Sequence, residues 1–380
     1  MSRIRLGMVG GGRDAFIGAV HRIAARLDDR FELVAGCFAS TAEKSKASGA
    51  DLGLADDRVY GDFTEMAKRE GRLKAGIEAV AIVTPNHLHF PAAREFLKRG
   101  IHVICDKPLT STLADARKLV RASERSGAVF VLTHNYTGYP MVRQARAMVA
   151  DGAVGAIRVV QVEYPQDWLT TALEDTGQKQ AGWRTDPARS GAGGSTGDIG
   201  THAFNLARFV TGLELDSLAA DLQTFVPGRR VDDNAHVLLR FKDGARGMLW
   251  SSQVAPGNEN GLRVRVYGAV GGLEWAQEDP NRLWFTPFGE ATRVLTRAGP
   301  GASEAAARVS RIPAGHPEGY LEAFATIYTE AADAISAQRD GSSTGLALLP
   351  GVQDGLEGVA FVDACVRSSK KNGAWVSLAL

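Results

Sequence analysis

This 380-residue chain lacks the features that mark several special classes of protein. Its three cysteines, Cys37, Cys105 and Cys365, are widely separated and form no Cys-x-x-Cys pair. We therefore expect neither a disulfide framework nor a cysteine-ligated metal site. Lysine and arginine together number 44, and aspartate and glutamate 43, which leaves a net charge of +1. This balance gives no reason to expect nucleic acid or an acidic membrane surface as a partner.

Long hydrophobic runs are missing as well. No run of 18 apolar residues occurs, and the first residues, MSRIRLGMVGGG, lead into a strand-like segment without the apolar core and cleavage site of a signal peptide. The 44% of hydrophobic and 23% of charged residues are ordinary for a globular protein. We expect a soluble, cytoplasmic protein, and the length favours two domains over one.

The N-terminal third of the chain alternates short apolar runs with helical patterns. Strand-like runs occupy residues 3–9, 31–37, 79–84, 102–105 and 129–133. Helical patterns between them occupy residues 19–27, 90–100 and 113–127. This alternation is typical of βαβ units, so a doubly wound parallel sheet is predicted for a first domain at residues 1–133.

The pattern changes after residue 134. Strands are expected at residues 217–226, 234–241, 245–253, 262–268 and 272–276, several of them joined by short turns such as KDGA and AVGG. Helices are expected at residues 140–151, from about residue 196, and at residues 317–338 and 350–369. The short turns predict a mostly antiparallel, open sheet. The fold class is therefore α/β, with a second, α+β domain at residues 134–380. Its uncovered sheet face suits a homodimer or homotetramer.

A glycine-rich turn follows the first strand. Gly10-x-Gly12-x-x-Ala15 fits the Gly/Ala form of the dinucleotide fingerprint, and Phe16 opens the next helix. Such a turn lets the backbone approach a pyrophosphate and directs helix amides toward it. The fingerprint also expects an acid at the end of the second strand, where Phe38, Ala39 and Ser40 stand instead. With Lys44 and Lys46 nearby, the choice between NAD and NADP stays open.

Two further segments follow strands of the predicted parallel sheet, where open α/β sheets bind ligands. In TPNHLH, residues 84–89, the turn at Pro85 and Asn86 can run along a dinucleotide, and its histidines either face the ligand or only cap a helix. In CDKPL, residues 105–109, Lys107 follows a buried strand, although lysines usually lie on exposed surfaces. Pro108 disfavours helical geometry at Lys107. The alternative is a solvated loop lysine.

The stretch GAGGSTGDIGTHAFNLARF, residues 191–209, places Asp198 and His202 four residues apart on one helix face. Ser195 or Thr196 is a natural N-cap, and Asp198 in the first turn also suits the helix dipole. We expect the helix end to lower the pKa of His202 and the nearby carboxylate to raise it, which suits a general base. A zinc site using His316 is disfavoured, because no metal-binding spacing occurs. The residues around Ser195 do not form a nucleophile elbow.

These motifs, in this order, resemble the glucose–fructose oxidoreductase / inositol dehydrogenase / MocA (Gfo/Idh/MocA) family over essentially the whole chain. The family's E-K-P motif corresponds to Asp106-Lys107-Pro108, with aspartate in place of glutamate. Its D-x-G-x-H motif corresponds to residues 198–202, beginning with Asp198 and ending with His202. The resemblance implies an N-terminal Rossmann domain. It also implies a catalytic set of Lys107, Asp198 and His202 in a cleft between the domains.

Within the family, GWRTDPARSGAGGSTGDIGTHAFN and GHPEGYLEAFA are most similar to the levoglucosan dehydrogenases and related glycoside 3-dehydrogenases, which use NAD. This similarity implies that Tyr136, Trp183, Arg184 and His316 line the sugar, although Trp183 is also a candidate core residue and Arg184 a candidate partner of Asp186. The residues that the fingerprint and the resemblance assign to the cofactor are Gly10, Gly12, Ala15, Phe16, Ser40, Thr84, Pro85, Asn86, His89, Asp106, Lys107 and Asn135.

Three functions are compatible with these residues. The first is hydride transfer between NAD(P) and a ring secondary alcohol of a sugar, anhydrosugar or cyclic polyol, with His202 as general base and Lys107 stabilising the alkoxide. The second is elimination of a glycosidic substituent through transient ring oxidation with the dinucleotide retained. The third is a non-catalytic dinucleotide or sugar sensor, which has no need to keep all three polar residues.

Overall fold

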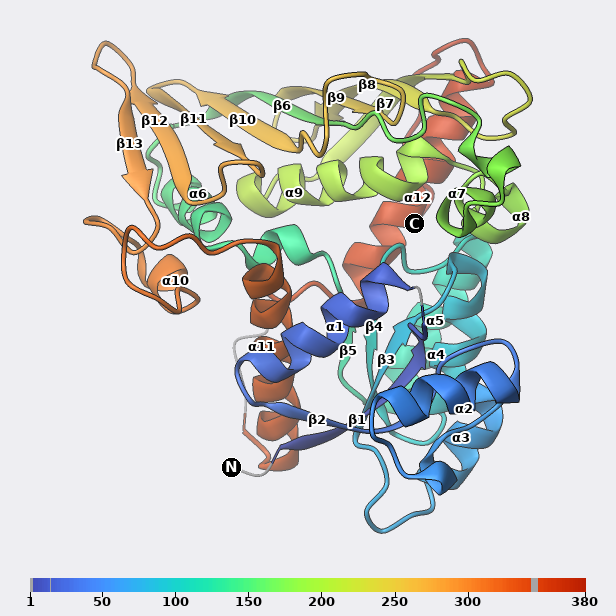
Figure 1. Ribbon diagram of the computed structural model, residues 1–380. Coiled ribbons are helices and arrows are strands. Elements are labelled where there is room, and N and C mark those ends of the chain that lie inside the picture. The colour runs from blue at the N-terminus through green and yellow to red at the C-terminus, as the bar shows by residue number, and fades with distance from the viewer. Residues whose placement is uncertain (1–2, 14, 343–347) are drawn as a thin grey trace. The chain divides into compact units, whose positions relative to one another are not determined.

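The structure is a computed structural model that describes residues 3–13, 15–342 and 348–380 (Figure 1). The chain forms two compact units. The first unit comprises residues 1–135 and 321–356, and the second comprises residues 136–320 and 357–380. The division into domains at residues 1–133 and 134–380 stays a prediction. Among the helices of the described ranges, none combines the length and the apolar composition needed to cross a membrane.

The first unit contains a five-stranded parallel sheet in the order β2-β1-β3-β4-β5. Its strands are β1 (Ile4–Gly10), β2 (Phe31–Cys37), β3 (Ala79–Val83), β4 (His102–Cys105) and β5 (Phe130–Leu132). Every residue of the central strand β3 is buried, as expected for a parallel sheet covered on both faces. The doubly wound parallel sheet predicted from the sequence is confirmed.

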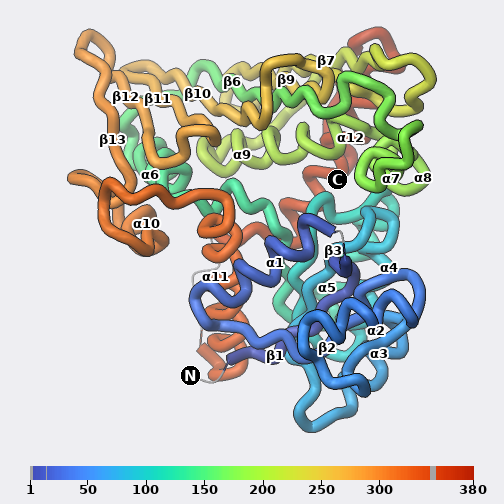
Figure 2. Tube along the Cα trace, viewed as in Figure 1, coloured from blue at the N-terminus to red at the C-terminus, as the bar shows by residue number. Residues whose placement is uncertain are grey.

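The helices of the first unit come from both its N-terminal and its C-terminal segments. They are α1 (Phe16–Leu27), α2 (Ala42–Asp51), α3 (Phe63–Glu70), α4 (His89–Leu97) and α5 (Leu113–Ser126), with the short helices η1 (Asp56–Arg58) and η2 (Asn86–Leu88). The C-terminal α11 (Tyr320–Arg339) lies beside α1 and β2 (Figures 1 and 2). There Asp333 pairs with Arg30 at 2.7 Å, and Thr329 donates to Asp28 at 2.6 Å.

The second unit is built on an eight-stranded sheet in the order β13-β12-β11-β10-β6-β9-β8-β7. Its strands are β6 (Ile157–Pro165), β7 (Leu215–Gln223), β8 (Asn234–Phe241), β9 (Arg246–Ser252), β10 (Arg263–Gly268), β11 (Gly271–Ala276), β12 (Arg282–Pro287) and β13 (Arg293–Thr296). The strands pair antiparallel except β6 with β9, so the mostly antiparallel sheet is confirmed. The strands expected from the sequence did not include β6, β12 or β13.

One face of this sheet is covered by α9 (Thr201–Thr211) and α6 (Pro140–Ala150), as Figure 1 shows. On α9, Phe204 stacks on Phe361 of α12 (Val352–Ser369), with ring centroids 4.4 Å apart. The other helical segments are η3 (Asn135–Gly138), η4 (Leu173–Thr176), α7 (Lys179–Arg184), α8 (Pro187–Ser190), η5 (Thr196–Gly200) and α10 (Glu304–Ala307). On the other face Leu238, Met248 and Tyr267 are exposed. Assembly of a homodimer or homotetramer through this face stays a prediction.

Candidate active site

The turn after β1 is packed too tightly to hold side chains. Gly10 and Gly11 have φ values of +84° and +70°, in the region that favours glycine. A Cβ added to Gly12 would lie 2.8 Å from the Phe38 carbonyl oxygen, and one added to Gly11 would lie 2.8 Å from the Cα of Gly18. Neighbouring atoms therefore occupy the positions that side chains of these residues would take, and only glycine fits this tight turn. This arrangement fits the pyrophosphate of a dinucleotide.

The residues around the turn show how its ends are fixed. Ala15 immediately precedes α1, and Phe16 on its first turn is 68% exposed. At the end of β2 the Phe38 amide donates to Ser45 Oγ at 2.9 Å, while Ser40 is exposed. The ribose-binding acid that the fingerprint expects has no counterpart at residues 38–40, as the sequence already indicates.

His89 connects two of the predicted cofactor segments. Its ring nitrogens lie 2.8 Å from the Thr84 carbonyl oxygen and 2.7 Å from that of Pro108. The imidazole is completely buried, and burial lowers its pKa. His89 thus joins the end of β3 to the turn after β4. Pro85 is half-buried and Asn86 is buried in the short helix η2. Direct contacts of these residues with the cofactor stay a prediction.

Lys107 follows β4 and is half-buried rather than fully solvated. Its peptide bond to Pro108 is cis. The preceding Asp106 accepts a hydrogen bond from Thr133 Oγ1 at 2.9 Å. Burial, and after it the charge of Lys107, lowers the pKa of His134 to about 3, so this imidazole is neutral at physiological pH. Asn135, also predicted to contact the cofactor, is 1% exposed.

The mouth of α9 differs from the predicted capped helix. Residues Thr196–Gly200 form a π-helical turn, a feature often found at functional sites. Ser195 already has helical φ and ψ values and its side chain makes no capping hydrogen bond, and Thr196 uses its hydroxyl to donate to Asp232 at 2.7 Å. The N-cap prediction for Ser195 and Thr196 is therefore wrong. The carboxylate of Asp232 performs that task by accepting from the Gly194 and Thr196 amides, each at 2.8 Å.

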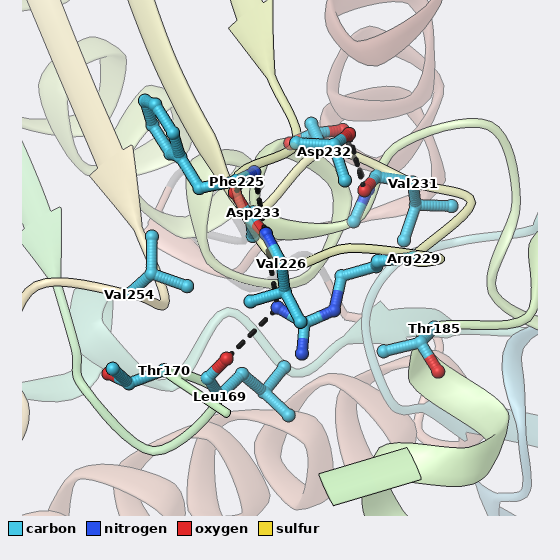
Figure 3. A network of polar contacts seen from close by, with 12 residues as sticks. Leu169, Thr170, Thr185, Phe225, Val226, Arg229, Val231, Asp232, Asp233 and Val254 are labelled. Carbon is cyan, nitrogen blue, oxygen red and sulfur yellow. Dashed lines mark hydrogen bonds and ion pairs between the residues drawn. The ribbon is translucent and has the colours of Figure 1, made fainter. Parts of the chain in front are cut away.

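The segment around Asp232 supports a second part of the site. Asp233 binds the buried Arg229 at 3.2 Å, and Arg229 also reaches the Leu169 carbonyl oxygen at 3.0 Å (Figure 3). The Asp233 carbonyl oxygen accepts from the Gln253 amide at 2.8 Å. Adjacent aspartates thus hold the mouth of α9 and the backbone of Gln253.

Asp198, inside the π turn, is bound by two side chains. Its Oδ2 accepts from Arg184 Nε at 3.2 Å and from Gln253 Nε2 at 2.9 Å. Arg184 also lies over the ring of Trp183, 4.3 Å from its centroid. The alternative partner of Arg184 considered from the sequence, Asp186, instead pairs with Arg230 at 2.7 Å, so that pairing is corrected.

His202 lies on α9, one turn after Asp198, and is 7% exposed. Its ring meets the Tyr136 ring edge-on, with centroids 4.8 Å apart. The Tyr136 hydroxyl is 2.5 Å from that of Tyr164, which donates to Asn260 Oδ1 at 2.7 Å. Burial raises the pKa values of both tyrosines, so they remain neutral hydroxyls. His202 is therefore lined by uncharged groups that hydrogen-bond.

The other predicted sugar-binding residues take different positions. Trp183 is half-buried, so it is not a core residue, and its indole N–H donates to Gln180 at 3.2 Å. His316 is exposed in the segment between β13 and α11, and its ring nitrogen is 3.4 Å from the Pro313 carbonyl oxygen. A sugar contact of His316 stays a prediction. Within the described parts of the chain, no three histidine, cysteine or acidic side chains are grouped as metal ligands.

Two residues of the site that the sequence did not indicate lie at the ends of strands, and a third, Asp232, does not. Tyr164 and Gln253 lie at the carboxyl ends of β6 and β9, which form the parallel pair of the second sheet. Ligand-binding residues gather at such ends in open sheets. The alternation of Val160, Val162 and Tyr164 was a usable signal for β6. For Asp232 the sequence offers no local signal, because its partners are 36 and 38 residues away.

Comparisons with known proteins match both units. Residues 4–134 match the family model described as "Oxidoreductase family, NAD-binding Rossmann fold". Residues 142–274 match the model described as "GFO/IDH/MocA C-terminal domain". The crystal structure of an oxidoreductase from Sinorhizobium meliloti is 66% identical in sequence, with a TM-score of 0.91, covering 99% of this chain and 100% of that one.

Two relatives have more specific descriptions. An inositol dehydrogenase homolog from Azotobacter vinelandii, crystallised with NADH and myo-inositol, is 37% identical, with a TM-score of 0.92, over 99% of this chain and 98% of that one. Levoglucosan dehydrogenase from Pseudarthrobacter phenanthrenivorans is 26% identical over 100% of this chain and 99% of its own length.

Proposed function

Since the chain belongs to the Gfo/Idh/MocA family of oxidoreductases and has its NAD-binding Rossmann fold, we propose that it moves a hydride between NAD and a ring secondary alcohol. The substrate is a sugar, an anhydrosugar or a cyclic polyol. The observation that carries the proposal is the placement of Asp198 on a π turn and of His202 one turn later on α9, beside neutral hydroxyl and amide groups.

The first unit fits the dinucleotide. Gly10, Gly11 and Gly12 form a turn too tight for side chains, as the dinucleotide fingerprint requires, and α1, whose first amides can bind a pyrophosphate, follows this turn. When bound, NAD supplies the hydride acceptor. The missing acid at residues 38–40 keeps NADP in the test as a second dinucleotide.

The side chains divide the remaining chemistry. His202 takes the proton of the reacting hydroxyl as general base, which is worth roughly 10²–10⁴-fold in rate. The Lys107 ammonium hydrogen-bonds the same oxygen and stabilises its developing negative charge. Asp198, fixed by Arg184 and Gln253, either accepts a hydrogen bond from a neighbouring hydroxyl or orients His202. Lys107 belongs to the first unit and His202 to the second, so their action on one oxygen is part of the proposal.

The wall beside His202 favours an uncharged ring. Tyr136, Tyr164 and Asn260 offer hydroxyl and amide groups, and the charge of Arg184 is balanced by Asp198. Such groups match the hydroxyls of a polyol. The higher identity to the inositol dehydrogenase homolog than to levoglucosan dehydrogenase places inositols first among the compounds to test.

A substrate panel tests the proposal. Inositols, anhydrosugars and simple glycosides are incubated with NAD or NADP, and the absorbance of the reduced dinucleotide is followed. We expect stoichiometric reduced dinucleotide with an uncharged ring substrate. An aglycone released without net NADH would replace this proposal with the elimination reaction. Binding of dinucleotide and sugar without any turnover would replace it with a sensor. Cytoplasmic location stays a prediction.

A further inference from the structure

His21 is a completely buried histidine of the first unit that the proposed reaction does not use. It lies on α1, the helix that begins at the dinucleotide turn. Its Nδ1 is 2.8 Å from the hydroxyl of Tyr328, and its ring centroid is 5.1 Å from that of Phe324. Both partners belong to α11. The C-terminal segment therefore fixes one edge of the imidazole.

The other edge of the ring faces Asp106. His21 Nε2 lies 3.8 Å from Asp106 Oδ1 and makes no hydrogen bond within the described residues. A buried ring nitrogen is costly to leave without a polar partner, so this orientation needs an explanation. The carboxylate supplies one, because an N–H directed at an anion is favourable at ion-pair distance.

The protonation states follow from the neighbours. Burial raises the pKa of Asp106, but His21 and then Lys107 lower it by more, so that the pKa falls to about 2. Asp106 is therefore an anion at neutral pH. An anion favours a proton on the facing Nε2, and the Tyr328 hydroxyl then donates to Nδ1. The Tyr328 hydroxyl thus donates to His21 Nδ1, and the N–H at His21 Nε2 faces the Asp106 carboxylate.

We propose that His21 is a positioning residue for Lys107. This inference rests on the proposed function of Lys107 as the group that stabilises the alkoxide. His21 from α1 and Thr133 after β5 both contact Oδ1 of the Asp106 carboxylate. Asp106 and Lys107 are adjacent in the turn after β4, so fixing the first fixes the backbone that carries the second. An error of about 1 Å in a positioning group can cost about 100-fold in rate.

Two amide variants separate the edges of the imidazole. The side-chain nitrogen of His21→Gln takes the place of Nε2 and can still donate to Asp106. The amide of His21→Asn takes the place of Nδ1 and can reach only Tyr328. We expect His21→Asn to lower kcat about tenfold or more and His21→Gln to stay within about threefold of the wild type. The Kd for NADH, measured by fluorescence, should change less than about twofold in both.

His21→Gln loses the buried hydrogen bond to Tyr328, and His21→Asn loses the buried contact with Asp106, so the unfolding midpoints of both variants provide the control for stability. Equal kcat values in His21→Asn and His21→Gln would overturn the inference, whether both match the wild type or both are equally impaired. Tyr328→Phe removes only the hydroxyl that fixes the ring, and we expect an intermediate loss of kcat.

Lys107→Met separates this inference from the proposed function. If Lys107→Met keeps wild-type kcat, the proposed function fails whatever His21 does. If Lys107→Met is impaired, adding His21→Asn should cause no further loss, because the group being positioned is gone. A further tenfold loss in the double variant would show that His21 acts elsewhere and would overturn the inference.

Discussion

The two units build their functional surfaces by different means. In the first unit the backbone forms most of the site, through glycines at which no side chain fits and through carbonyl groups that His89 joins. In the second unit side chains from distant segments meet at one turn, where Asp232 holds its backbone and Gln253 binds Asp198. A backbone site depends on short local motifs, whereas a side-chain site depends on the complete fold.

The largest expected effect concerns the second unit. His202→Ala removes the proposed general base and should lower kcat about 10²–10⁴-fold. The Kd for NADH should stay nearly unchanged, because the residues predicted to bind the dinucleotide belong to the first unit. Steady-state kinetics and fluorescence titration measure the two quantities. A variant with near wild-type kcat on its true substrate would exclude His202 as the base.

The complementary change in the first unit should act on binding. In Gly12→Ala the added Cβ meets the Phe38 carbonyl oxygen and Ser48 Oγ, both at 2.8 Å. Overpacking of this kind costs about 1–3 kcal/mol of stability, so the free energy of unfolding should fall by that amount, and the displaced turn should also raise the Kd for NADH. Gly358→Ala on α12 is the matched control, since its Cβ meets nothing within 4 Å. Equal Kd values in the two variants would contradict the tight approach at Gly12.

The units should also differ in the sign of a pH effect. Burial raises the pKa of Asp106, but His21 and Lys107 lower it more, from 3.8 to about 2. Its carboxylate therefore stabilises the fold above pH 3.8, and about 2 kcal/mol is lost as the pH falls toward 2. Burial raises the pKa of Asp232, so its ionisation opposes folding as the pH rises above 3.8.

Urea unfolding between about pH 2 and pH 6 tests this difference. Asp106→Asn should reduce the loss of stability at the acid end. Asp232→Asn should reduce the loss that accompanies rising pH. If the two substitutions changed the pH dependence in the same direction, the contrast between the two carboxylates would be wrong.

The smallest effect should come from a partner of Asp198. Gln253→Leu removes a hydrogen bond of 2.9 Å to the carboxylate but leaves Arg184 in place. A hydrogen bond to a charged group contributes about 1.5–3 kcal/mol, and Arg184 retains part of it, so KM should rise about tenfold. Gln161→Leu is the control, because its amide contacts Met248 on the exposed sheet face. If Gln161→Leu raised KM more than Gln253→Leu, the sugar would bind on the opposite face of the sheet from the one proposed.

Prediction from the sequence succeeded where local patterns decide the structure. The apolar runs of β1 to β5 and the glycine turn are specified by neighbouring residues, so the parallel sheet and its NAD-binding fold follow from the sequence. The antiparallel class of the second sheet also follows, because its short turns are local signals.

Other features depend on contacts that no local pattern contains. The edge strand β13 is largely exposed, and β12 beside it contains a single buried residue, so burial leaves little pattern in either strand. The N-cap prediction failed because Asp232, far along the chain, satisfies the amides that Ser195 or Thr196 would have capped. Arg184 likewise pairs with Asp198 and not with its sequence neighbour Asp186, because folding brings the more distant carboxylate within reach.

The return of the chain at residues 321–356 has a consequence for biosynthesis. Residues of this segment pack with strands and helices that are translated before the second unit: Tyr328 binds His21, and the Pro350 carbonyl oxygen accepts from the Leu132 amide at 2.9 Å. The parallel sheet can therefore complete its packing only after residue 350 has been made. Until then the first unit stays incomplete while residues 136–320 of the second unit are synthesised.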